Sequence, residues 1–266
     1  MDELIILVST CDKAKICWAP FIAAFNKAWP DCPYKRYFVT NYLDVEDKIG
    51  GFRAIPVGED KGWATNLKSA LKHIPEDVQF FLYMQEDFWL TAPVHTDFVK
   101  QELSFCKKNS IASLRLTCPW LDLYRIDERH ALSPVGLEPY ALCLSAGIWN
   151  KFFFEQLLVS GWTGWDFEEK VAAMVETDTK SFVLLENVSQ QEFRLIGLAG
   201  GAVRRGRWTR EAARYLKNNG YSHLVMKRSV EGPFYTGLLS FARINKYTRI
   251  MASRIIVLMH RKKINI

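Results

Sequence analysis

The chain has 266 residues, 49% of them hydrophobic, which suits one large domain or a domain with an appendage. Its net charge of +6 is uneven, because the stretch from Gly232 to the C-terminus holds seven Lys and Arg residues and no acid, leaving the rest at −1. Charge gathered at one end, rather than across a folded face with interleaved aromatic residues, argues against a nucleic-acid binder.

Cysteine and histidine spacing excludes further classes. The six cysteines form no CxxC pair and no disulfide framework, so we expect free thiols in a reducing cytosol. No signal peptide precedes the first apolar run, which agrees with a cytoplasmic location. The five histidines lack the spacing of a zinc site, and nothing supports a Ser-His-Asp triad. No run of about 20 apolar residues predicts a membrane span.

The first half of the chain alternates strands with helices. Leu4-Ile5-Ile6-Leu7-Val8 is a continuous apolar run, typical of a buried strand. Apolar residues between Thr65 and Ile74 recur at intervals of three and four, which predicts a helix. We expect strands at residues 4–8, 37–40, 52–57 and 78–84, and helices at 14–29 and 65–74. This alternation predicts an α/β fold, a mainly parallel sheet with helices on both faces.

The second half is less regular. Strands are expected at 111–116, 140–144 and 182–185, and helices at 149–159 and 167–175. Residues 117–138 suggest loops and a hairpin near an acceptor site.

The basic C-terminal segment 238–263 has the pattern of an amphipathic helix. Its apolar arc holds Phe241, Ile244, Met251, Ile255 and Leu258. Its other side holds Arg243, Lys246, Arg254 and Arg261. Such a helix lies in the interface of an anionic membrane, where each cation adds about 1 kcal/mol. The alternative is a helix packed on the catalytic domain with a solvated basic face.

Two acids follow a buried strand. Phe80-Phe81-Leu82-Tyr83-Met84 runs into Gln85-Glu86-Asp87, and ligands of open α/β sheets bind beyond the carboxyl ends of strands. Mg²⁺ or Mn²⁺ would join such carboxylates to substrate phosphates. Asp87, furthest along the turn, is the preferred metal ligand. The alternative is an ordinary solvated loop end.

Three stretches of the chain share the order and spacing of one known group of proteins. The first is Ser9-Thr10-Cys11-Asp12-Lys13 with Trp18 and Trp29-Pro30-Asp31-Cys32-Pro33-Tyr34. The second is Gly58-Glu59-Asp60-Lys61-Gly62-Trp63, leading to Gln85-Glu86-Asp87-Phe88. The third is Leu144-Ser145-Ala146-Gly147-Ile148-Trp149, then Gly164-Trp165-Asp166-Phe167-Glu168. Over about residues 4 to 210 the chain thereby resembles the bacterial glycosyltransferases of capsule and lipopolysaccharide loci with a GT-A-like fold. The resemblance implies a Rossmann-type mixed sheet flanked by helices.

The resemblance also implies the donor site. The loop after the first strand would cradle the nucleotide, the 60–63 segment would close over it, and the acidic turn would stand in for a DxD motif. Gln85 occupies the place of that motif's first Asp. The implied donor-binding residues are Thr10, Cys11, Asp12, Asp60, Lys61, Trp63, Asn66 and Glu86.

Transfer with inversion needs a carboxylate that removes a proton from the acceptor hydroxyl. The 161–169 run joins glycines, tryptophans and acids at a helix start, where N-terminal capping is the alternative role for the acids. By resemblance Glu168 is the base, and Asp166 either binds the acceptor or is the base itself. The acceptor-binding residues expected are Ser145, Ala146, Gly147, Trp162 and Trp165, with Gly147 opening a helix.

The stretch 200–208 combines glycines with Arg204, Arg205 and Arg207, whose guanidinium groups suit a diphosphate clamp. The alternative is a solvated basic loop.

Together these features predict a metal-assisted glycosyltransferase that moves a sugar from a nucleotide donor to a glycan or lipid-linked oligosaccharide of the cell surface. The catalytic domain would span 1–231, with a nucleotide-sugar half at 1–90 and an acceptor half at 91–231, followed by the basic tail 232–266. A sugar nucleotidyltransferase is the main rival, although Ser9-Thr10-Cys11-Asp12 lacks the glycine of its phosphate loop. A non-catalytic glycan-binding module at the membrane is the second.

Overall fold

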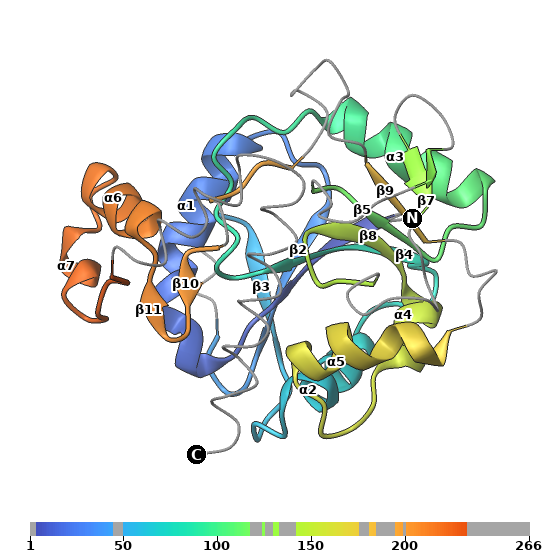
Figure 1. Cartoon of the computed structure of the whole chain (residues 1–266), viewed down its shortest axis with the longest axis horizontal. Helices are drawn as coiled ribbons and strands as arrows, with labels where there is room; N and C mark the ends of the chain where they lie inside the picture. Colours follow the sequence, from blue (N-terminus) through green and yellow to red (C-terminus); the bar gives the residue numbers. More distant parts are fainter. Residues whose placement is uncertain are drawn as a thin grey trace. The chain divides into compact units, whose positions relative to one another are not determined.

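The structure is a computed structural model that describes residues 4–44, 50–117, 124–125, 130–132, 142–175, 181–184, 195–198 and 201–232 (Figure 1). The chain divides into two compact units, Met1–Leu198 and Ala199–Ile266, and each is described by itself. Among the described residues no helix is long and apolar enough to cross a membrane.

The first unit is built on a mixed sheet. Its described strands lie in the order β3-β2-β1-β4-β8-β5-β9-β7-β6. They are β1 (Leu4–Ser9), β2 (Lys35–Thr40), β3 (Phe52–Pro56), β4 (Phe80–Gln85), β5 (Ser113–Arg115), β6 (Tyr124–Arg125), β7 (His130–Leu132), β8 (Gly147–Asn150) and β9 (Ser181–Leu184). Strands β3, β2, β1 and β4 are parallel, whereas β8 runs antiparallel to both β4 and β5. The expected mixed α/β sheet is therefore confirmed.

Helices cover both faces of this sheet (Figure 1). One face carries η1 (Asp12–Cys17), α1 (Trp18–Ala28) and α3 (Thr96–Lys108), and the other α2 (Trp63–Leu71), α4 (Lys151–Leu157), α5 (Gly164–Lys170) and η2 (Val171–Met174). On the α1 face, Phe21 packs edge-on against Phe38 and Phe52 with ring centroids 5.5 and 5.8 Å apart. On the α2 face, one buried cluster joins Leu7 and Phe81 of the sheet to the helices. Burial on both faces explains why the central strands are continuous apolar runs.

Several expected elements need correction. Gly147 opens the strand β8 rather than a helix, and α4 begins only at Lys151, where the Asn150 side chain caps it by accepting from the Phe153 amide. The described part of the strand expected at 140–144 has no strand conformation. The hairpin expected within 117–138 includes the antiparallel pair β6 and β7. The helix α3 is an element that the sequence does not predict.

The second unit begins with a hairpin, β10 (Val203–Arg204) and β11 (Arg207–Trp208), followed by α6 (Arg210–Asn218) and α7 (Ser222–Val225). Arg205 and Gly206 form its two-residue turn with φ values of 49° and 72°, the positive values that such a turn requires. Residues 203–208 of the stretch that holds the predicted clamp arginines therefore form an ordered hairpin. The basic tail from residue 233 lies outside the described residues, and its helix stays a prediction.

Candidate active site

The loop after β1 and the acidic turn Gln85-Glu86-Asp87 leave the sheet at the same edge. The parallel register of β1 and β4 places Ser9 beside Gln85, so Thr10-Cys11-Asp12 and Glu86-Asp87 follow at neighbouring strand ends. Burial raises the pKa of the Cys11 thiol, and the negative charge of Glu86 adds to this rise. The described residues contain no group of three or more His, Cys, Asp or Glu side chains that could hold a metal. A cation here would need oxygens from its ligand as well as from Glu86 or Asp87.

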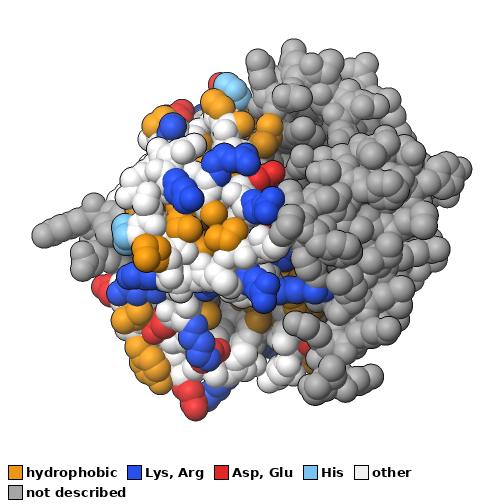
Figure 2. Space-filling model, turned by 60° about the vertical axis from the view of Figure 1, so that its left-hand side comes forward, with side chains coloured by type: hydrophobic (Ala, Val, Ile, Leu, Met, Phe, Trp, Pro, Cys, Tyr) orange, Lys and Arg blue, Asp and Glu red, His pale blue; other side chains and the backbone are white. Residues whose placement is uncertain are grey.

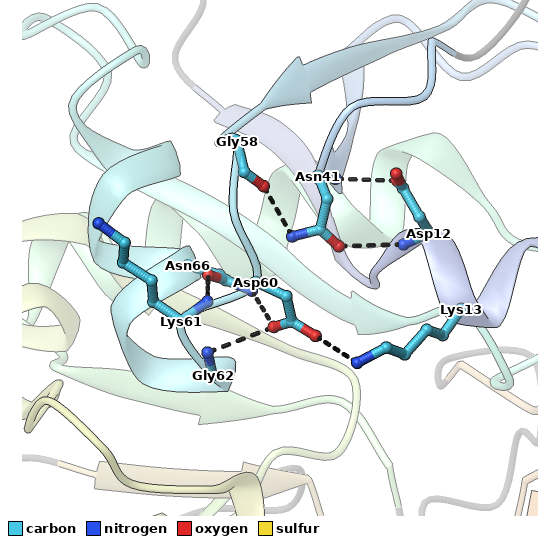
Figure 3. Close-up of polar contacts among 8 residues, drawn as sticks. All are labelled: Asp12, Lys13, Asn41, Gly58, Asp60, Lys61, Gly62 and Asn66. Carbon is cyan, nitrogen blue, oxygen red and sulfur yellow. Dashed lines mark hydrogen bonds and ion pairs between the residues drawn. The ribbon is translucent and has the colours of Figure 1, made fainter.

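Asp12 ties the end of β1 to the end of β2 (Figure 3). Its carboxylate accepts hydrogen bonds from the amides of Asn41 (2.9 Å), Tyr42 (2.9 Å) and Leu43 (3.2 Å). The Asn41 side chain accepts from the Asp12 amide at 3.2 Å and donates to the Gly58 carbonyl at 3.1 Å. Asp12 therefore shapes the loops at the ends of β1 and β2, because backbone amides donate to both of its carboxylate oxygens.

Asp60 is the centre of a second network (Figure 3). Its carboxylate accepts from Lys13 Nζ (3.0 Å), Asn66 Nδ2 (2.9 Å) and the Gly62 amide (3.2 Å). These bonds, the one from Lys13 foremost, lower the pKa of Asp60. Asn66 in turn accepts from the Lys61 amide at 3.1 Å, while the Lys61 side chain is exposed. The predicted donor residues of the 60–66 segment are thus brought together with the β1 loop.

Trp63 joins the sheet edge to α5. Its indole Nε1 donates to Ser9 Oγ (3.1 Å) and to Tyr83 Oη (3.3 Å), and its ring meets Phe167 edge-on at 5.3 Å. The next residue of α2, Ala64, donates its amide to the Trp162 carbonyl at 3.2 Å. Donor-side and acceptor-side loops predicted from distant motifs therefore share one core. Thr10, also predicted, accepts from the indole of Trp18 at 2.8 Å.

Asp166 belongs to the cap of α5. Thr163 accepts from the Asp166 amide, and the Asp166 carboxylate accepts from the Thr163 amide at 3.0 Å, which completes a capping box. Lys170 donates to the same carboxylate at 2.6 Å. The bonds from Lys170 and Thr163 lower the pKa of Asp166 to about 2. These contacts match the capping role that the sequence left open.

Glu168 has different surroundings. Its Oε1 accepts from the Leu144 amide at 2.7 Å, which connects α5 to the segment before β8. Burial raises the pKa of Glu168 despite the opposing effects of this hydrogen bond and of the Arg115 charge. A carboxylate whose affinity for protons is increased is better suited to general-base work than one held near 2.

The predicted acceptor residues belong to the two segments that the hydrogen bond between Glu168 and Leu144 connects. Ser145 and Ala146 follow Leu144, and a Cβ added at Gly147 would lie 2.7 Å from the Leu114 carbonyl oxygen. Gly147 is therefore required by the close approach of β5 to β8. Trp165 of α5 is 61% exposed. Trp162, which precedes α5, is half-buried, and Lys170 Nζ lies 5.6 Å from the centroid of its ring.

The three predicted clamp arginines belong to the second unit. Arg204 forms an ion pair with the buried Glu231 at 3.0 Å. Arg205 lies in the hairpin turn, half-buried, and Arg207 is exposed. Their role toward a diphosphate stays a prediction.

Asn41 is a site residue that sequence reasoning misses. It is 5% exposed and bonds to both neighbouring loops. Its position directly after the β2 run, at the carboxyl end of a parallel strand, is the signal that could have found it.

No protein-family model and no curated protein matches the chain. Among solved structures it is similar to residues 1–349 of S. aureus TarS, with 12% identity, a TM-score of 0.43, and coverage of 69% of this chain and 60% of that one. A cytidylyltransferase from Leptospira borgpetersenii shares 13% identity, a TM-score of 0.43, and coverage of 74% and 82%. A Drosophila β-1,4-galactosyltransferase 7 mutant in complex with manganese, UDP-Gal and xylobiose shares 11% identity, a TM-score of 0.36, and coverage of 74% and 70%. This chain spans less than two thirds of the TarS structure. The likeness is one of fold.

Proposed function

We propose that the chain is a nucleotide-sugar-dependent glycosyltransferase that acts with inversion and with help from Mn²⁺ or Mg²⁺. The observation that carries the proposal is the place of Glu168, a carboxylate on α5 that accepts from the Leu144 amide at 2.7 Å and whose pKa is raised by burial. Through the contacts of Trp63 with Ser9 and Phe167, that helix packs on the same core as the loops at the ends of β1 and β4.

The donor would lie over the ends of β1 and β4. The loop ordered by Asp12 and Asn41 would hold the nucleoside, and the 60–63 segment would cover it. Asp87, with Glu86 beside it, would hold the cation against the diphosphate, where the cation's charge favours departure of the nucleoside diphosphate. Support for this arrangement comes from the shared strand edge and from the two networks around Asp12 and Asp60.

In the transfer step Glu168 would remove the proton of an acceptor hydroxyl. The hydroxyl oxygen forms a bond to the anomeric carbon as the bond from that carbon to the diphosphate oxygen breaks. The proton remains on Glu168, and the electron pair leaves with the nucleoside diphosphate. The 145–147 segment and the rings of Trp162 and Trp165 would position the acceptor, which we propose to be a glycan or a lipid-linked oligosaccharide of the cell surface.

The test measures nucleoside diphosphate release and thermal shift across a panel of nucleotide sugars, with and without Mn²⁺. Glu168→Gln is expected to lower kcat by about 10²- to 10⁴-fold while the thermal shift with donor is retained. Its matched control is the neighbouring exposed acid, Glu169→Gln, which should keep wild-type turnover. Asp87→Asn should weaken the thermal shift that depends on Mn²⁺.

Two outcomes would overturn the proposal. One is wild-type turnover of Glu168→Gln. The other is formation of a nucleotide sugar from a nucleoside triphosphate and a sugar phosphate, which would identify a nucleotidyltransferase instead.

The pH dependence gives an independent check on the base. Because the deprotonated carboxylate is the active form, kcat/KM should rise with pH through the pKa of Glu168, at a higher pH than an ordinary glutamate would give. Measured from about pH 4 to 9, this rising limb should be missing from the residual activity of Glu168→Gln. A limb that is unchanged in the variant would assign the titration to another group.

A further inference from the structure

The two units differ sharply in charge. The second unit, Ala199–Ile266, holds fifteen of the 35 Lys and Arg residues but two of the 29 acidic residues. One of these acids, Glu231, is buried and paired with Arg204. The other, Glu211, stands in the first turn of α6. The folded part of this unit is therefore strongly cationic even without the tail.

The cations are arranged in order on α6. Arg210, Arg214 and Lys217 are exposed and stand at positions i, i+4 and i+7, which places them along one stripe of the helix. Another side of the helix is fixed by packing, because Ala212, Ala213 and Leu216 are buried. We call the three exposed residues the α6 stripe. Because this packing holds α6 in place, the three charges stay together on one exposed stripe rather than being scattered over a flexible chain.

An apolar side chain stands among further cations after α7. Met226 is 91% exposed, the most exposed of the large hydrophobic residues described, and Lys227 and Arg228 follow it directly. Val230 is 38% exposed. On the face shown in Figure 2, blue Lys and Arg side chains gather around orange hydrophobic ones. Such a mixture suits a membrane interface, where apolar groups enter the acyl boundary and cations meet the headgroups.

We propose that the folded part of the second unit is a docking surface for an anionic phospholipid membrane, with the α6 stripe as its main electrostatic contact and Met226 as an apolar anchor. A nucleic acid fits less well, because single strands are bound through stacking aromatic rings. Among the described residues of this unit, the large hydrophobic side chains that are exposed are Met226 and Val230, not aromatic rings.

The test uses the full chain and sedimentation with vesicles of phosphatidylglycerol and phosphatidylcholine, against vesicles of phosphatidylcholine alone. Wild type should bind only the anionic vesicles, and less so as salt rises. The triple variant Arg210→Gln, Arg214→Gln, Lys217→Gln should bind about a hundredfold more weakly, because each cation near such a surface contributes about a fivefold effect. Met226→Ser should weaken binding several-fold.

A matched control removes three exposed cations from a helix of the first unit, Lys100→Gln, Lys107→Gln, Lys108→Gln on α3. It should bind like wild type. Equal losses in the two triple variants would show that only net charge matters, and wild-type binding by the α6 variant would assign the membrane contact to the tail. Either result overturns the proposal, as would binding to single-stranded DNA without any binding to anionic vesicles. Vesicle sedimentation does not measure glycosyltransferase activity. Failure of the docking proposal would therefore leave the proposed function untouched.

Discussion

The donor side and the acceptor side of the candidate site hold their carboxylates in different ways. On the donor side Asp12 bonds to amides 29 to 31 positions away, and Asp60 reaches Lys13 across 47 positions. On the acceptor side Asp166 bonds within its own helical turn, to Thr163 and Lys170. The loop after β1 is therefore fixed by partners distant in the sequence, Asp60 combines the distant Lys13 with the nearby Gly62 and Asn66, and the start of α5 is fixed locally.

This difference separates structural acids from a reactive one. Asp12, Asp60 and Asp166 each serve a loop or a cap, and the pKa values of the last two are lowered by the bonds that do so. Glu168 bonds one amide and has a raised pKa. Of these four acids, Glu168 is thus the one best suited to act as a base, and it is the one least engaged in holding a loop or a helix cap.

Trp63 tests whether the two sides depend on each other, and its removal should have the largest effect. Trp63→Ala is expected to lower the free energy of unfolding by about 4 kcal/mol, because the indole packs against Phe154 and Phe167. Trp63→Phe keeps most of the packing but loses the hydrogen bonds to Ser9 and Tyr83. It should lower the free energy of unfolding by about 1 kcal/mol. Urea unfolding measures both. The exposed Trp165→Ala is the control, and an equal loss there would contradict a joining role for Trp63.

Asp12 tests the donor side alone. Asp12→Ala removes an acceptor from three backbone amides and should lower the free energy of unfolding by about 3 kcal/mol. Donor binding should weaken as well, since the loop loses its shape. Urea unfolding and donor thermal shift are the measurements, with the exposed Asp44→Ala as the matched substitution. If Asp12→Ala kept full stability but lost donor binding, Asp12 would contact the ligand rather than shape the loop.

Asp166 tests the local cap, with a smaller effect. Asp166→Ala should cost about 1 kcal/mol at pH 7. Its folded pKa of about 2 lies below the unfolded value, so the stabilisation is complete above the unfolded value and disappears as pH falls through the folded one. Urea midpoints of wild type and variant should therefore converge near pH 2. In a double-mutant cycle with Thr163→Ala the losses should not add, and additive losses would argue against the capping box.

Lys13 should have the smallest effect. Its side chain is 83% exposed, and an ion pair at such a site contributes little, so the free energy of unfolding of Lys13→Ala should stay close to that of wild type. Asn66→Ala, at a buried residue that bonds the same carboxylate, should cost about 1 to 2 kcal/mol. Thermal unfolding of the two variants measures both losses of stability. The reverse order would mean that the surface pair, not the buried amide, orders the 60–66 segment.

The centre of the parallel half of the sheet could be predicted because β1 and β4, at Leu4–Ser9 and Phe80–Gln85, are apolar runs buried on both faces. The helix α3 could not, since its inner face carries Glu102, which is 1% exposed. That acid bonds His130 of β7 at 2.8 Å, a partner that no sequence spacing reveals.

In the candidate site too, contacts between residues close in the sequence can be predicted, whereas contacts between distant residues cannot. Local features such as the Thr163 cap of α5 can be anticipated from sequence, because their partners are a few residues away. The contacts of Asp12 with Asn41 and of Glu168 with Leu144 depend on which strands and loops become neighbours, so they emerge only from the fold.

The place of β8 has a consequence for synthesis on the ribosome. Strand β4 needs β8 as its neighbour, yet the 61 residues between Gln85 and Gly147 must be translated first. At translation rates of about 5–20 residues per second, the β4 edge of the nascent chain would stay unpaired for several seconds or longer. We therefore expect chaperones to shield this strand edge during synthesis. Truncated chains that end before Gly147 should aggregate, because β4 then has no β8 to pair with.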